Sequence, residues 1–168
     1  MPLRRLLAEP DDLPRIVQIE NESFAESPLT TVLFPTGQSQ ESQDAYVKSL
    51  LQQWQENSAC HFVKVIDTDP NDKIIAFARW YIFVGDDVKF IKDNNERQNP
   101  PGANEAVANA FFGGLLRIRI ATLGRQPHCC ESRLAAELAK ISLLMSLRQT
   151  SARFARILSI GGEEQGQC

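Results

Sequence analysis

The chain has 168 residues, a length that fits one domain with a single substantial core. Its composition is 43% hydrophobic and 23% charged, as in an ordinary soluble globular protein. The formal net charge is −3 and the pI is about 5.4. This balance argues against nucleic acid or an anionic membrane as the main partner.

The N-terminus lacks the pattern of a targeting segment. Its two arginines are followed at once by Glu9, Asp11 and Asp12, whereas a signal peptide continues into an apolar stretch. In the sequence we find no apolar run that approaches the roughly 20 residues of a membrane span. We therefore expect a cytoplasmic protein that does not bind membranes.

Cysteine and histidine are not spaced as metal ligands. The cysteines form no CxxC pair, and each of the two histidines directly adjoins a cysteine. Zinc ligands are usually two to four residues apart, so that one turn can present both. We expect no metal site, and unpaired thiols in a reducing compartment. The cysteines are Cys60, Cys129, Cys130 and Cys168.

The first third of the chain is expected to be one strand followed by helices. Leucines at 3, 6 and 7 favour a short strand. Proline and acidic residues at 9–12 then favour a helix start, and apolar residues continue at helical spacing to about Phe24. Two prolines bound a helical turn at 27–35, and a second amphipathic helix covers about 41–56.

The middle of the chain predicts an antiparallel hairpin. Residues 61–66 and 74–84 are rich in β-branched and aromatic side chains, and the turn residues between them include Asp69 and Asn71. A long polar loop at 85–104 and another helix at 104–123 follow. If the sheet ends there, an open strand edge around 74–84 would invite pairing with a second copy.

The composition changes after His128. Residues 129–168 contain one aromatic residue, and apolar side chains recur at helical spacing. We expect a helix from Ser132, as its cap, to about 147, with a disordered end at 161–168. The sequence thus divides into a portion 1–128 and a helical tail 129–168.

Up to His128 the chain resembles the GCN5-related N-acetyltransferase superfamily, and more narrowly its small fungal members. The order and spacing of four stretches carry this resemblance, which covers about residues 1–128. These stretches are residues 3–12, 24–35, 73–80 and 111–128.

The resemblance implies an α+β fold in which helices flank an antiparallel hairpin. It implies acetyl transfer from acetyl-CoA to an amine, here a small molecule, without a metal. In the superfamily a central strand with a splayed bulge and a glycine-rich loop follow next, and the loop binds the CoA pyrophosphate. Residues 129–160 contain no such loop, so a helical tail is expected to replace this strand, loop and helix.

Two functions therefore stay open. The chain is an N-acetyltransferase-like enzyme with impaired donor binding, or it is a truncated or frame-shifted homologue that acts as an interaction module or is inactive. By resemblance, several side chains would line the acceptor pocket, and core packing is their alternative role. These candidates are Phe24, Leu29, Phe34, Trp80, Tyr81 and His128.

Other candidates have a simpler interpretation. Glu20 and Glu22 have the chemistry of general bases but are expected on a solvated helix face. Arg117, Arg119 and Arg125 could contact a phosphate, but Arg117 and Arg119 do not share a helix face, and a solvated surface is expected for them. A reactive cysteine at 129 or 130 would have only His128 as a nearby base, and neighbouring side chains of an extended segment point apart.

Overall fold

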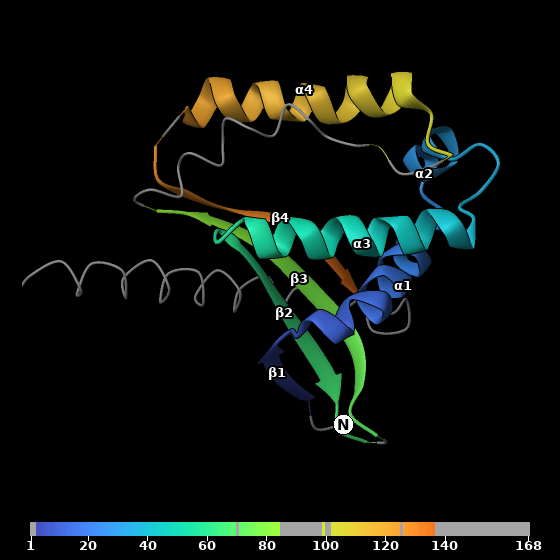
Figure 1. The fold of residues 1–168 in the computed structure, drawn as a ribbon, viewed down its shortest axis with the longest axis vertical. Helices are drawn as coiled ribbons and strands as arrows, with labels where there is room; N and C mark the ends of the chain where they lie inside the picture. The colour runs from blue at the N-terminus through green and yellow to red at the C-terminus, as the bar shows by residue number, and fades with distance from the viewer. Residues whose placement is uncertain (1–2, 70, 85–98, 100–101, 125, 137–168) are drawn as a thin grey trace, which may run out of the picture.

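The computed structural model describes residues 3–69, 71–84, 99, 102–124 and 126–136. Four antiparallel strands form one sheet in the order β1-β2-β3-β4 (Figure 1). The strands are β1 (Leu3–Leu7), β2 (Cys60–Asp67), β3 (Lys73–Phe83) and β4 (His128–Ala136). The predicted first strand and hairpin are confirmed.

The hairpin turn contains the two described non-glycine residues with a left-handed backbone. Asn71 has φ 73° and Asp72 has φ 51°. Asparagine and aspartate tolerate this conformation better than other residues with a side chain, which is why they fit the turn.

The helices begin where the sequence supplies start signals. Pro10 opens a short 3₁₀ turn, Pro28 opens α2, and the side chains of Ser39 and Asn104 cap α3 and α4 by accepting hydrogen bonds from Ser42 N and Val107 N. The elements are the 3₁₀ turn (Pro10–Asp12), α1 (Leu13–Phe24), α2 (Pro28–Leu33), α3 (Gln40–Glu56) and α4 (Glu105–Leu123).

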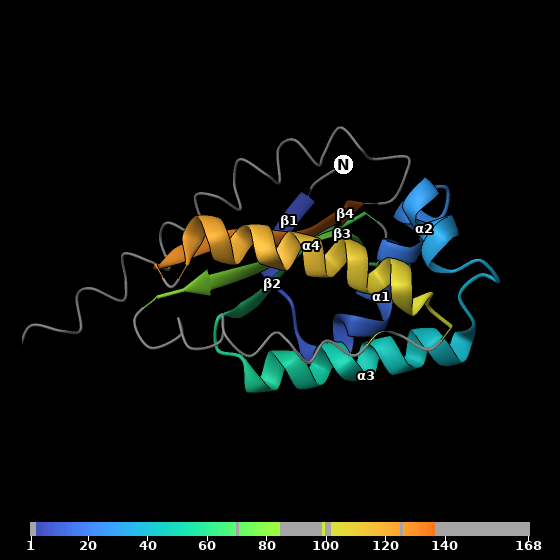
Figure 2. The same ribbon diagram turned by 90° about the horizontal axis from the view of Figure 1, so that it is seen from above.

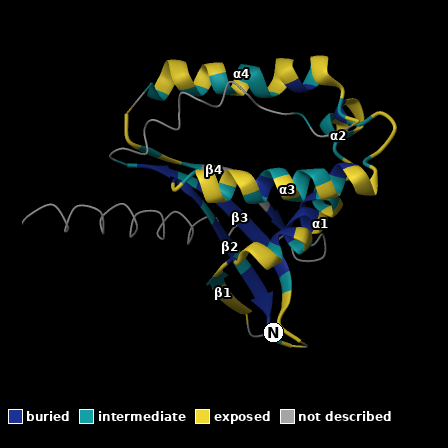
Figure 3. Cartoon of the chain, viewed as in Figure 1, coloured by how far each residue is buried: buried dark blue, intermediate teal, exposed yellow. Residues whose placement is uncertain are grey.

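The core lies between one face of the sheet and helices α1 and α3 (Figures 1 and 3). Leu13, Ile16 and Ile19 of α1 are fully buried there against strand residues such as Phe62 and Phe77. On the α3 side, the ring of Trp54 lies 4.7 Å from that of Phe62. The residues of β3 alternate, since Ala78, Trp80 and Ile82 form a separate buried cluster on the other face.

Strand β4 corrects two expectations. A helix was expected to begin at Ser132, but residues 128–136 are extended and pair with β3. The helical spacing of apolar residues falls mostly beyond 136, while pairing with the buried strand β3 governs the residues before it. The predicted open edge at 74–84 is also wrong, because β4 covers it.

Several predicted segments lie outside the described residues. These are most of the loop at 85–104, residues 137–147 of the expected tail helix and the chain end at 161–168. Division of the chain at His128 stays a prediction, although residues 129–136 belong to the same sheet as β1–β3.

Helix α4 stands apart from α1 and α3 in Figure 1, and in Figure 2 it also lies clear of α3. Its N-terminus is tied to α2 by a hydrogen bond from Asn104 N to Leu33 O at 2.7 Å. Apolar side chains are exposed along it, including Leu115 at 52% and Ile118 at 65%. The sequence analysis expected no stretch that could span a membrane, but α4 is long and apolar enough to do so by length and composition alone. Core helices of soluble proteins meet the same criterion.

The buried aromatic layer gives the first prediction. Phe62→Ala should lower the free energy of unfolding by about 3–5 kcal/mol, because it empties the space between α3 and the sheet. Phe111→Ala on the exposed side of α4 should change it by less than about 0.5 kcal/mol. Urea denaturation of both variants measures the difference. Equal losses would mean that α4 is as firmly packed as the core.

Candidate functional site

The pairing between β3 and the edge strand β4 is interrupted partway along the two strands. Arg79 pairs with Arg133 and Trp80 pairs with Glu131, so Ser132 is an extra residue without a partner on β3. Such a β-bulge disrupts the hydrogen-bond ladder locally and re-aims the backbone. The sequence reading had missed this strand and its bulge.

Arg79 lies beside the bulge and is buried between the sheet and the helices. Only 8% of its surface is exposed, and its guanidinium carbon lies 5.9 Å from the ring centres of both Phe62 and Tyr81. Burial lowers the pKa of Arg79, but Tyr46, Tyr81 and Glu20 outweigh it and the net shift is upward. Arg79 therefore keeps its charge inside the protein.

Glu20 reaches the same layer from α1. Its surface is 7% exposed, and the hydroxyl of Tyr46 on α3 lies 3.3 and 3.4 Å from its two carboxylate oxygens. The expectation of a solvated face is wrong for Glu20, because the helix turns this position toward the charge of Arg79. A carboxylate, a phenol and a guanidinium thus meet next to the bulge.

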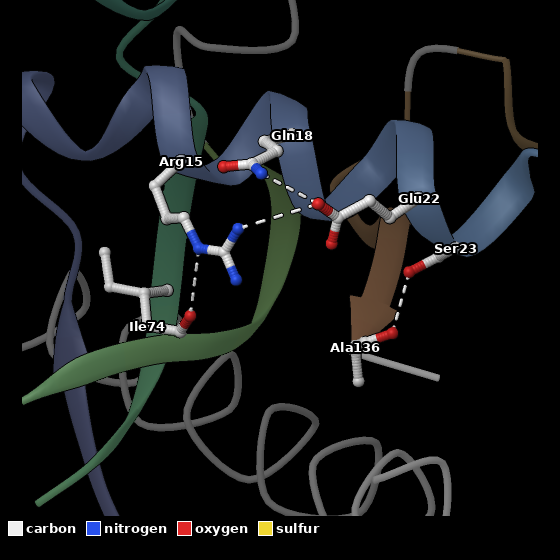
Figure 4. Close-up of polar contacts among 6 residues, drawn as sticks. All are labelled: Arg15, Gln18, Glu22, Ser23, Ile74 and Ala136. Atoms are coloured by element: carbon white, nitrogen blue, oxygen red, sulfur yellow. Dashed lines mark hydrogen bonds and ion pairs between the residues drawn. The ribbon is translucent and has the colours of Figure 1, made fainter. Parts of the chain in front are cut away.

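Glu22 lies on the outer side of the same helix, as expected (Figure 4). Its carboxylate accepts a hydrogen bond from Gln18 at 2.8 Å and lies 3.9 Å from the guanidinium of Arg15. One residue further on, the hydroxyl of Ser23 donates to the backbone oxygen of Ala136 at 2.7 Å. The end of α1 is thereby fixed to the end of β4.

Two thiols and a phenol lie side by side on three neighbouring strands, two residues beyond Arg79 along β3. Tyr81 pairs with Cys60 on one side and with Cys130 on the other. Burial, partly offset by Arg79, raises the pKa of Cys60 to about 11 and that of Tyr81 to about 12. The two cysteines are separated by two strand spacings, roughly 9–10 Å, which is too far for a disulfide.

The residues predicted to line a pocket lie in three places. Phe24 and Tyr81 pack against the core cluster between sheet and helices, whereas Trp80 faces the opposite side of the sheet, as alternation requires. Leu29 is on α2 and Phe34 at its end. His128 begins β4 and pairs with Phe83.

The six residues predicted to line the acceptor pocket therefore do not form one cluster in the described part of the structure. Tyr81 and His128 are linked through Phe83, whose ring is stacked on Tyr81 at 5.8 Å and lies 4.9 Å from His128. Whether these residues bind a substrate stays a prediction.

The sequence analysis did not identify Arg79, and it did not predict that Glu20 and Arg119 are partly or fully buried. One signal was available, since Arg79 is the single charged residue in the apolar run from Ile74 to Val84. A charge inside a buried strand is rare unless it is paired or functional. The described residues contain no group of three or more histidine, cysteine or acidic side chains that could hold a metal ion.

Two solved structures share this fold, while no family model and no curated protein matches the chain. One is mosquito arylalkylamine N-acetyltransferase like 5b, with 14% identity, a TM-score of 0.60, and coverage of 94% of this chain and 72% of that one. The other is the C-terminal condensation domain of Ebony in complex with β-alanyl-dopamine, with 15% identity, a TM-score of 0.59, and coverage of 93% and 71%.

At these identities the likeness concerns the fold. The chain shares an α+β fold with both structures, one of them an N-acetyltransferase-like protein, and this confirms the fold class expected from the sequence.

The raised pKa values give a pH prediction. Cys60 and Tyr81 ionise near pH 9 and 10 when unfolded but only near 11 and 12 when folded. The unfolded state therefore loses these protons first, and the free energy of unfolding should fall as the pH rises above about 9. In Cys60→Ala the fall should be smaller, because one of the thiols whose pKa is raised on folding is gone, while Cys129 and Cys130 still contribute. Urea titrations between pH 8 and 11 test this, and identical curves for both proteins would contradict it.

Proposed function

We propose that the chain is an amide-forming acyltransferase that moves an acyl group from a thioester, acetyl-CoA, to the primary amine of a small molecule. One observation carries the proposal: a bulged strand at the edge of the described sheet lies beside a buried carboxylate, in a fold shared with an N-acetyltransferase-like protein. The bulge supplies a backbone group outside the ladder, and the carboxylate supplies a base.

The bulge at Ser132 would act on the thioester. A backbone N–H that is freed from the ladder can donate to the thioester oxygen as negative charge develops there. Donors of this kind are effective because they are already oriented when the reaction begins. Such a role needs only the peptide backbone, so it survives changes of the Ser132 side chain.

Glu20 would act on the amine. It accepts one proton of the ammonium group, and the neutral amine then forms the C–N bond. The C–S bond breaks to release the thiolate, the nitrogen loses its second proton to solvent, and the thiolate takes a proton from solvent. The hydroxyl of Tyr46 orients the carboxylate, and the charge of Arg79 lies nearby. The buried position keeps Glu20 at the inner wall of the acceptor site.

We propose an arylalkylamine as the acceptor. The names of both structural neighbours refer to aromatic amines or their amides. Here Phe24, Tyr46 and Tyr81 pack against the same core cluster and provide an aromatic surface near the carboxylate. An aromatic ring beside an ammonium group matches this combination of aromatic and acidic side chains.

The donor side is the weaker half of the site. The sequence after β4 lacks the glycine-rich loop expected for a pyrophosphate, so we expect acetyl-CoA to bind less tightly than when several backbone N–H groups converge on it. The three described cysteines are free, which fits a reducing, cytoplasmic location. If no thioester binds, the alternative is a non-catalytic module, with β4 as the sheet edge for pairing with a second copy.

Glu20→Gln tests the proposal directly. With acetyl-CoA and an arylalkylamine such as tyramine, it should lower kcat by about 10²–10⁴-fold, because the base is lost while the shape is kept. Glu22→Gln on the outer face of α1 is the matched control and should retain full activity. Calorimetric titration of the full chain with acetyl-CoA gives the donor affinity. Absence of turnover in the folded wild-type chain would overturn the proposal.

The backbone role of the bulge gives a second test. Ser132→Pro removes the N–H and should lower kcat by about 10²-fold or more, whereas Ser132→Ala keeps the N–H and should leave kcat nearly unchanged. Circular dichroism verifies that both variants are folded. Equal activity of the two variants would exclude the backbone donor.

A further inference from the structure

Helix α4 carries an apolar stripe that no described element covers. Phe111, Leu115 and Ile118 follow one another at intervals of four and three residues, so they lie on one face of the helix. Their exposed fractions are 41%, 52% and 65%, and much of the helix is coloured as exposed in Figure 3. Single exposed apolar residues are common, whereas a continuous exposed row along a helix marks an interaction surface.

A glycine lies beside this stripe and has no packing role among the described residues. Gly114 is one turn from Phe111 and one turn from Ile118, and a glycine inside a helix is destabilising relative to alanine. A Cβ atom at this position would meet only the end of the Arg117 side chain, at 3.9 Å, which is an ordinary contact. A second helix lying close against α4 would need the small residue, because side chains at the contact set the distance between helix axes.

The way α4 is attached argues against a bilayer as its partner. Its start is tied to α2 by the hydrogen bond from Asn104 N to Leu33 O at 2.7 Å, and β4 begins only five positions after its last residue. A helix whose two ends are held on the folded protein cannot cross a membrane. A helix that lies in a membrane surface has a polar face rich in lysine and arginine, whereas α4 has two arginines and no lysine.

The charges of α4 complement those of a second, antiparallel α4. Glu105 is exposed in the first turn and Arg117 is exposed near the end, while Arg119 is half-buried and Arg125 lies outside the described residues. Glu105 and Arg117 are each six positions from Phe111. In an antiparallel pair centred on Phe111, the acidic start of each helix is therefore level with the basic end of the other. A parallel pair would bring like charges together.

We propose that the stripe of Phe111, Leu115 and Ile118 binds a second copy of this chain, with the two α4 helices side by side and antiparallel. Helix α4 has 19 residues and is about 28 Å long. Two such helices bury on the order of 1,000 Å² in total, the lower limit of a specific interface. The dimer is therefore reversible, with a dissociation constant on the order of 10–100 μM. This surface is separate from the edge of β4, and the proposed acyl transfer takes no part in it.

Sedimentation equilibrium of the full chain, at concentrations up to about 500 μM, measures the dimer. Leu115→Glu and Ile118→Glu should each weaken it at least about tenfold, because each places a carboxylate in the apolar contact. Ile120→Glu is the matched control, since Ile120 is 43% exposed on the opposite face of α4 and its replacement should leave the dimer unchanged. Circular dichroism verifies that the variants are folded. A wild-type chain that stays monomeric, or equal losses in Ile118→Glu and Ile120→Glu, would overturn the proposal.

An exchange of charges tests the antiparallel arrangement. Glu105→Lys and Arg117→Glu should each weaken self-association several-fold at low ionic strength, because each brings like charges together at both ends of the pair. An equimolar mixture of the two variants should associate more tightly than either alone, since opposite charges are then level at both ends. The proposal is wrong if the mixture associates no better than the single variants, or if the wild-type chain cosediments with phosphatidylcholine vesicles and does not dimerise.

Discussion

The buried charge of Arg79 is the constraint on which the interior of this protein depends. A guanidinium between a sheet and its covering helices loses its hydration, and it is tolerated only where other groups replace water. Here Phe62 and Tyr81 offer the faces of their rings, and Glu20 and Tyr46 provide the polar surroundings. Each comes from a different element, so the charge fixes how α1, α3, β2 and β3 are arranged.

The same constraint explains why the candidate site lies where it does. Arg79 is the last β3 residue paired before the bulge, and Glu20 faces it from α1. Three residues after Glu20, Ser23 bonds to the end of β4. Helix α1 therefore positions the carboxylate and also holds the strand whose ladder is broken. A shift of α1 would move the proposed base and the proposed backbone donor together.

The elements that local pattern specifies were predictable. The hairpin follows from alternating β-branched and aromatic residues with a turn at Asp69–Asp72, and α1, α3 and α4 follow from helical spacing with start signals. Strand β4 was not predictable in this way. Its residues carry no alternation that outweighs the helical pattern after them. Pairing with β3 residues that lie 45 to 60 positions earlier in the sequence (Phe83 with His128, Ala76 with Ala136) decides their conformation.

The candidate site is harder to predict from the sequence than the fold, because it also depends on contacts between distant elements. Glu20 and Glu22 differ by two positions on one helix, and the sequence does not say which faces the sheet until the position of Arg79 is known. A bulge is a property of two strands, so Ser132 alone gives no sign of it. Arg117 and Arg119 are two positions apart and therefore lie on different helix faces, and the sequence does not show which of the two is turned toward the sheet.

Helix α4 is attached to the rest of the protein at two points along its length. It is attached at its start through Asn104 to α2 and near its end through Arg119 to Phe83 and Cys130, while apolar residues between the two attachments are exposed. A helix held at two ends by polar contacts keeps its position without a continuous packed face.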